Sequence, residues 1–156
     1  MITAPDGSIA SYDAKRTREF YAHLPPTGGK CDCAGCRNYR AAWTPDRFDS
    51  ALIEACTEIG IDARKAFETA AYGGEPLHYE GELPFFGAVQ NFQRLKERFH
   101  PWFFVPDPIC GPNFAAGIVA IQFFIDLPWV LAGPNPYKQD MEKSLRRLEA
   151  RRKENA

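Results

Sequence analysis

The chain has 156 residues, of which 45% are hydrophobic and 13% aromatic, and its formal net charge is −1. A chain of this length and composition can bury a hydrophobic core as a single domain, residues 1–156, without needing disulfide bonds. The near-neutral charge argues against nucleic acid or an anionic membrane as a partner. The longest apolar run, residues 117–131, is broken by Gln122, Asp126 and Pro128 and is too polar to span a bilayer.

Residues 1–30 predict an irregular N-terminal arm, because neither the helical nor the strand period dominates in residues 12–24. The start of the chain lacks a continuous apolar segment, so we expect no signal peptide and a cytoplasmic location. In that reducing compartment, clustered cysteines bind metal or remain thiols more often than they form disulfides. The sequence PPTGG, residues 25–29, predicts a loop that leads to the cysteines.

Residues 31–72 predict a cysteine loop followed by helices. Asp32 is a candidate N-cap for a short helix over residues 33–42, because a carboxylate accepts hydrogen bonds from the free N–H groups of a first turn. Thr44 and Pro45 are the residue types preferred at the N-cap and the first position of a second helix. The apolar stripe of that helix and its glycine stop comprise Phe48, Leu52, Ala55, Cys56, Ile59 and Gly60.

One cysteine, Cys56, falls on this stripe, and we predict that it packs as a small buried hydrophobe. Asp62 follows the glycine stop and is a candidate cap for a third helix that extends to about residue 71. The glycines at positions 73 and 74 then end that helix. Helices are therefore expected to dominate the N-terminal half of the chain.

The pattern changes in residues 76–131, which are rich in aromatic residues, glycine and proline and predict short strands joined by turns. Four strands are expected, over residues 77–82, 85–90, 102–105 and 115–125. A final amphipathic helix is predicted over residues 135–153, because Asn135 and Pro136 repeat the pattern of a cap followed by proline. The predicted fold class is α+β, with a helical N-terminal half, a small antiparallel sheet in the C-terminal half and this last helix.

The most distinctive motif is C-x-C-x-x-C, formed by Cys31, Cys33 and Cys36, which holds three of the five cysteines within six residues. Two cysteines three residues apart can bind one tetrahedral metal ion, and a preceding Cys-x-Cys step can add a third sulfur. Zinc is the cofactor that this ligand set favours, and Cys110 is the preferred fourth ligand because it lies in a proline-rich loop. The other candidates for the fourth ligand are the histidines His23, His78 and His100.

Two other interpretations of the cysteines stay open. Three reduced thiols can simply pack at the junction between a loop and a helix. Alternatively, the chain is a thiol-based redox enzyme that uses Cys33 and Cys36, since N–H groups at a helix start lower the pKa of a thiol. The loop before them differs from the strand that precedes a thioredoxin-type C-x-x-C, and no G-x-S-x-G, P-loop or H-E-x-x-H motif is present. The sequence therefore favours a non-enzymatic binding module.

A further interpretation places a pocket for a small apolar ligand or a protein partner on the aromatic β segment. Ordinary core packing explains most of the same aromatic residues. The candidate pocket residues are Phe86, Trp102, Phe104, Phe123 and Trp129. The final helix has only a narrow apolar stripe and a basic end diluted by glutamates, so we expect a monomer or a weak homodimer.

The run GKCDCAGCRNY, residues 29–39, resembles a C-x-C-x-x-C-x-N-aromatic motif found in a group of small uncharacterised bacterial proteins. The similarity continues through the Ile-Gly-Ile-Asp turn at residues 59–62 and reaches the Pro-Trp pair at residues 128–129. It therefore covers residues 29–131 and leaves out the final helix. The resemblance implies one integrated α+β domain in a bacterial protein and adds no particular activity.

Overall fold

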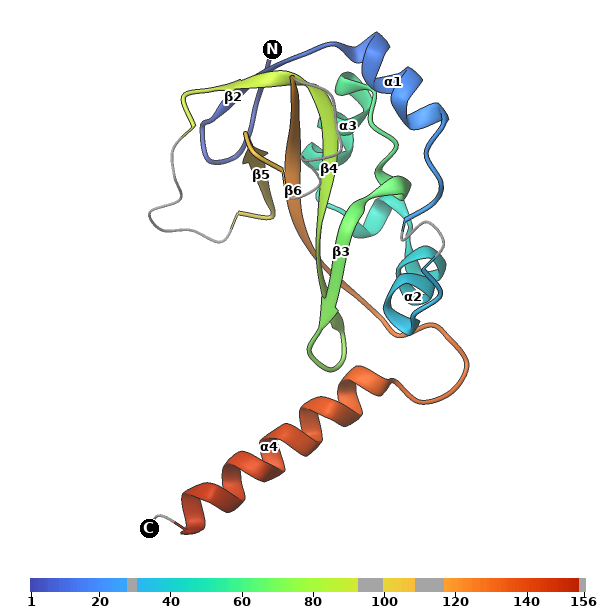
Figure 1. The fold of residues 1–156 in the computed structure, drawn as a ribbon, viewed down its shortest axis with the longest axis vertical. Helices are drawn as coiled ribbons and strands as arrows, with labels where there is room; N and C mark the ends of the chain where they lie inside the picture. Colours follow the sequence, from blue (N-terminus) through green and yellow to red (C-terminus); the bar gives the residue numbers. More distant parts are fainter. Residues whose placement is uncertain (28–30, 93–99, 109–116, 155–156) are drawn as a thin grey trace.

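The structure is a computed structural model that describes residues 1–27, 31–92, 100–108 and 117–154. One antiparallel sheet forms the centre of the molecule, and three helices lie on the same side of it (Figure 1). The last helix leads away from the sheet. The four helices are α1 (Ala14–Ala22), α2 (Ala34–Ala42), α3 (Ser50–Ile59) and α4 (Pro136–Glu154).

The sheet has six strands in the order β1-β2-β4-β6-β5, with β3 also paired to β4. These strands are β1 (Ile2–Thr3), β2 (Ile9–Tyr12), β3 (Phe67–Tyr72), β4 (Leu77–Gln90), β5 (Trp102–Val105) and β6 (Ile118–Leu127). Strand β4 organises the sheet, because β6 pairs along one edge of it while β3 and β2 share the other edge. All of these pairings are antiparallel.

The predicted helical N-terminal half is wrong, although the fold is a mixed α+β fold with an antiparallel sheet. Residues 1–30, predicted as an irregular arm, contribute β1, β2 and α1. Strand β2 pairs with the far end of β4, from Ile9 opposite Gln90 to Tyr12 opposite Gly87. A four-residue strand gains its stability from such a distant partner, and a local sequence window does not contain that partner.

The predicted third helix is also wrong, because only the short 3₁₀ turn η2 (Ala63–Lys65) follows Asp62. The next residues form β3, which pairs with β4 from Phe67 opposite Glu82 to Tyr72 opposite His78. Two alanines inside this segment favour a helix by intrinsic propensity, but pairing along β4 overrides a preference of a few tenths of a kcal/mol per residue, roughly.

Helix α3 carries the predicted apolar stripe but begins later than expected. Thr44 precedes a separate 3₁₀ turn, η1 (Pro45–Arg47), and the cap of α3 is Asp49, whose side chain accepts a hydrogen bond from Leu52 N at 3.0 Å. The helix ends as predicted at Gly60, which adopts the left-handed conformation with φ 88°.

Two of the predicted strands, over residues 77–82 and 85–90, are one continuous strand, β4. Pro84 falls between the part of β4 that pairs with β3, which ends at Glu82, and the part that pairs with β2, which begins at Gly87. The missing N–H of the proline is tolerated there because neither β3 nor β2 requires it. The strand predicted over 102–105 is confirmed, and the one predicted over 115–125 corresponds to β6.

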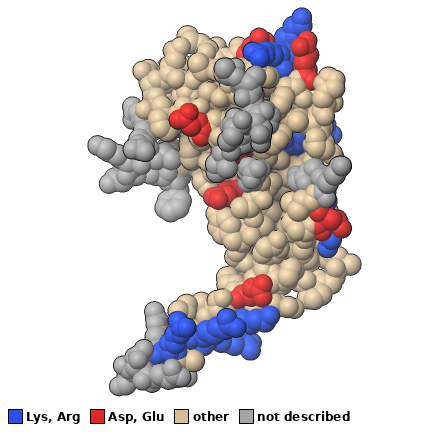
Figure 2. Space-filling view, in the orientation of Figure 1, with Lys and Arg blue, Asp and Glu red and all other residues tan. Residues whose placement is uncertain are grey.

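Helix α4 confirms the predicted final helix. Asn135 is buried and fixes its first turn, because Oδ1 accepts from Tyr137 N at 3.0 Å and Nδ2 donates to Gly74 O at 2.7 Å. Farther along, Met141, Leu145 and Leu148 are exposed, and Figure 2 shows Lys and Arg side chains gathered along this helix. Among the described residues, no helix combines the length and the apolar character that crossing a membrane requires.

Candidate metal centre

The cysteine loop lies at the N-terminus of α2. Cys33 is the N-cap of this helix, and its Sγ accepts a hydrogen bond from Cys36 N at 3.4 Å. The predicted cap, Asp32, is one residue too early, and its backbone oxygen instead accepts from Arg37 Nη1 at 2.6 Å. Cys31 and Cys33 are exposed, whereas Cys36 is buried on the first turn of the helix.

The Sγ atoms of Cys31, Cys33 and Cys36 all lie within 4.8 Å of one another. Sulfurs that bind a tetrahedral zinc ion at about 2.3 Å are separated from each other by about 3.8 Å. The three thiols therefore need to approach one another by about 1 Å at most, which side-chain rotation provides. The three cysteines lie close enough to hold one metal ion.

The pKa values of Cys33 and Cys36, at the start of α2, are shifted in opposite directions. The hydrogen bond from the Cys36 backbone N–H lowers the pKa of Cys33, with smaller contributions from the neighbouring thiols. Burial, followed by the nearby sulfurs of Cys33 and Cys31, raises the pKa of Cys36 to about 12. Cys33 therefore ionises first, and a cation among the sulfurs would offset the penalty on the second thiolate.

The fourth ligand stays a prediction, because Cys110 lies outside the described residues. No histidine of the described part of the chain joins the cysteine group. His23 Nδ1 lies 2.8 Å from Glu19 O, and His78 Nδ1 lies 2.8 Å from Asp126 Oδ1. Both rings are thus engaged elsewhere on the molecule.

A buried asparagine that sequence reasoning did not single out fixes α2 beside the sheet. Asn38 has no exposed surface and donates Nδ2–H to Tyr79 Oη at 3.1 Å and to Pro128 O at 3.0 Å. Its Oδ1 accepts from Val130 N at 2.8 Å. The signal in the sequence was an asparagine in the interior of a predicted helix, where this residue type is unfavourable unless its side chain has a structural partner.

Gly35 brings the cysteine loop against two other elements. Its carbonyl oxygen accepts from Tyr79 Oη at 3.1 Å. A Cβ placed on Gly35 would lie 2.5 Å from Tyr137 Oη and 3.1 Å from Ala71 Cβ, so a larger residue here would force the Tyr137 side chain to shift. The first turn of α4 therefore packs directly on the first turn of α2.

Cys56 lies in a contrasting environment. It is only 2% exposed within the hydrophobic core, and burial raises the pKa of its thiol to about 12. This agrees with its predicted role as a small buried hydrophobe.

The five residues of the predicted aromatic pocket lie in and beside the core. Phe86, Trp102, Phe104 and Phe123 are buried, and Trp129 is half-buried. Both indoles have internal partners: Trp102 Nε1 donates to Asp49 Oδ1 at 3.2 Å and Trp129 Nε1 donates to Gly133 O at 3.0 Å. These contacts serve packing, and a role of these residues in ligand binding stays a prediction.

Comparisons of this chain with protein-family models, with curated proteins and with solved structures found no match. The functional argument therefore depends on the geometry of the cysteine loop.

Proposed function

We propose that the chain is a non-enzymatic binding module in which Cys31, Cys33 and Cys36 hold one structural zinc ion. The observation that supports this most is the mutual distance of the three sulfurs, all within 4.8 Å. Thiolates are soft ligands and zinc prefers tetrahedral sulfur sites, so the donor set favours zinc over calcium or magnesium.

The exposure of the sulfurs supports metal binding over simple packing. A free cysteine that only fills space behaves as a small hydrophobe and is usually buried, as Cys56 is. Cys31 and Cys33 are exposed instead, at a loop where they gain no comparable burial. Bringing three thiols together on such a loop favours their joint use.

A zinc ion at this site would connect the loop to the first turn of α2. Asn38 and Gly35 already hold that turn against β4, the 128–130 segment and the start of α4. The ion would therefore stabilise a surface at the junction of these elements, where we propose that a protein partner or a small ligand binds in the cytoplasm. Cys110 remains the proposed fourth ligand.

The test is metal analysis of protein purified without chelator. We expect native mass spectrometry and elemental analysis to give one zinc per chain, and removal of zinc to lower Tm by roughly 5 °C or more. Cys33→Ser and Cys36→Ser should lose the ion, while Cys56→Ala should keep it. A metal-free chain in which Cys31, Cys33 and Cys36 titrate as free thiols, with an unchanged Tm in chelator, would refute the proposal.

The lowered pKa of Cys33 supports a second candidate, a thiol-based redox enzyme. The Cys33 thiolate would attack a substrate disulfide, forming a mixed disulfide and releasing one substrate thiolate. The Cys36 sulfur, losing its proton, would then attack Cys33 Sγ and release the second substrate thiolate. The substrate disulfide is reduced to two thiols, and the chain ends with a Cys33–Cys36 disulfide.

Alkylation rates as a function of pH test this second candidate. A lowered pKa increases the thiolate fraction at neutral pH, so Cys33 should react with iodoacetamide with a midpoint clearly below about 8.5. Cys36, whose pKa is raised, should react only at much higher pH. A Cys33 midpoint at the ordinary value in zinc-free protein would rule out the redox function and leave the zinc site untouched.

A further inference from the structure

A cavity of about 480 Å³ lies outside the cysteine loop, beside the C-terminal end of α2 and the 3₁₀ turn η2. This volume is in the range of small-molecule binding sites. The lining residues come from three separate segments of the chain and are Pro26, Arg40, Trp43, Asp62, Arg64 and Lys65.

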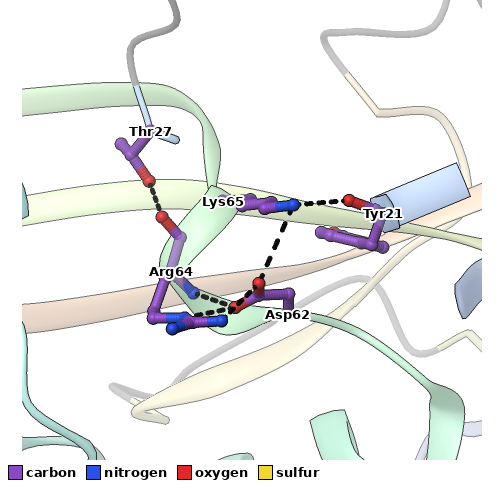
Figure 3. Close-up of polar contacts among 5 residues, drawn as sticks. All are labelled: Tyr21, Thr27, Asp62, Arg64 and Lys65. Atoms are coloured by element: carbon purple, nitrogen blue, oxygen red, sulfur yellow. Dashed lines mark hydrogen bonds and ion pairs between the residues drawn. The ribbon is translucent and has the colours of Figure 1, made fainter. Parts of the chain in front are cut away.

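The cavity has more positive than negative charge. The one carboxylate among the described lining residues, Asp62, is bound at both oxygens by Arg64, with Nε and Nη2 each 2.9 Å away. This ion pair holds the pKa of Asp62 below its usual value, so the carboxylate is ionised. Lys65 also approaches Asp62, but its Nζ stays 4.0 Å from Oδ2 (Figure 3). Asp62 is therefore committed mainly to Arg64.

The two remaining cations, Lys65 and Arg40, donate hydrogen bonds to neutral carbonyl groups, and Lys65 also keeps its long ion pair with Asp62. Lys65 Nζ donates to the carbonyl oxygen of Tyr21 at 2.7 Å. Arg40 Nη1 donates to the carbonyl oxygens of Thr27 at 2.8 Å and Cys31 at 3.3 Å, and within the described residues it forms no ion pair with a carboxylate. A half-buried cation without a counter-charge loses hydration, and a bound anion would offset that loss.

The segment with Pro26, which lines the cavity, is anchored to the turn η2 through Thr27. Figure 3 shows Thr27 directed at the backbone of Arg64, where Thr27 Oγ1 donates to the carbonyl oxygen at 2.7 Å. Thr27 also donates its N–H to the same oxygen at 3.3 Å. The carbonyl that orients Arg40 is therefore fixed to the same turn that carries Arg64 and Lys65. The positive groups are preorganised relative to one another, which reduces the ordering cost of binding.

Trp43 gives the cavity an apolar wall. The ring is half-buried and packs against Phe48, with the ring centroids 5.6 Å apart. A fixed indole of this kind offers a large flat surface to an apolar ring, and a guanidinium nearby can bind a carboxylate or phosphate through two N–H groups.

We propose that this Trp43 cavity binds a small organic anion, with a carboxylate or phosphate group carried on a flat apolar ring. The anionic group lies between Arg40 and Lys65, and the ring lies against Trp43. The site is distinct from the proposed zinc site, which it contacts through the hydrogen bond from Arg40 to the carbonyl oxygen of Cys31.

Three probes that share one ring separate the contributions of charge and shape. They are 1-naphthoate, 1-naphthyl phosphate and the neutral 1-naphthamide, titrated by calorimetry into the full-length chain as purified. We expect whichever anion fits best to bind at least about tenfold more tightly than the amide. The comparison between the two anions identifies carboxylate or phosphate as the preferred group.

Arg40→Gln and Lys65→Gln each should abolish most of this tenfold preference while circular dichroism shows an unchanged fold. Lys65→Gln keeps an N–H donor for Tyr21 O, so it removes the charge with little disturbance of the turn. Arg146→Gln, on the exposed part of α4, is the matched control and should bind like the parent chain. Equal binding of anion and amide, no binding of any probe, or equal losses in the Arg146 control would overturn the proposal.

Discussion

Helices α2 and α3 are close in length, 9 and 10 residues, and lie on the same side of the sheet, yet they are attached to it differently (Figure 1). Helix α3 is held by an apolar stripe that includes Leu52 and Ile59, both almost completely buried. Helix α2 is held by Tyr39 in the core and by the three hydrogen bonds of Asn38. The cysteine of α3 is enclosed by the core, whereas Cys31 and Cys33 are exposed just before the start of α2 and Cys36 lies on its first turn.

This difference shows how one cysteine is buried and unreactive while others can reach a metal ion. Apolar packing is non-directional and tolerates small rotations of a helix about its axis. Hydrogen bonds depend on angle, so the contacts of Asn38 fix the rotation of α2. That rotation decides where Cys36 and Cys33 point, and therefore whether three sulfurs can meet at one ion.

The largest loss of stability should come from shortening an apolar side chain that packs α3 into the core. Leu52→Ala removes a side chain that is 1% exposed, and we expect the free energy of unfolding to fall by about 3 kcal/mol. Urea denaturation measures this loss. The folded variant should still bind one zinc, and loss of the ion would show that the two helices do not act separately.

A smaller loss of stability, together with weaker zinc binding, is expected when the hydrogen bonds that hold α2 are removed. Asn38→Ala removes the partners of the Val130 N–H and the Pro128 carbonyl, which are partly buried, and of the buried Tyr79 hydroxyl, at a cost of roughly 2 kcal/mol. Because α2 is then free to rotate, zinc affinity measured by competition with a chelator should fall as well. Unchanged zinc affinity would argue against a positioning role for Asn38.

The smallest effect is expected where α2 meets α4. In Gly35→Ala the new methyl group meets the Tyr137 hydroxyl, and we expect a loss of about 1 kcal/mol. Tyr137→Phe removes that oxygen, so the double variant should recover much of the loss in a double-mutant cycle of thermal unfolding. Additive losses in the cycle would mean that the cost of alanine arises inside α2.

Features that depend on neighbouring residues could be predicted from the sequence. The stripe and the glycine stop of α3 repeat within one helix, and the three cysteines span six residues, so their proximity follows from local geometry. The cap of α4 is equally local, since Asn135 accepts from the N–H groups of Tyr137 and Lys138.

Features that depend on distant partners could not be predicted in this way. Strand β3 contains alanines that favour a helix, and only β4 makes it a strand. Asn38 binds residues about 40 and 90 positions away, so its place inside a predicted helix indicated a structural partner but could not identify which one. The Trp43 cavity combines three segments and has no local signature.

The seating of α4 has a mechanical consequence. Its first turn is fixed by Asn135 and Tyr137, and the whole 19-residue helix is about 28 Å long. A tilt of about 10° at the base therefore swings the distal tip by about 5 Å. That base rests on Gly35, between Cys33 and Cys36, so a rearrangement of the cysteine loop that tilted the base would displace the C-terminal end of α4, and a fluorescent label there would report it.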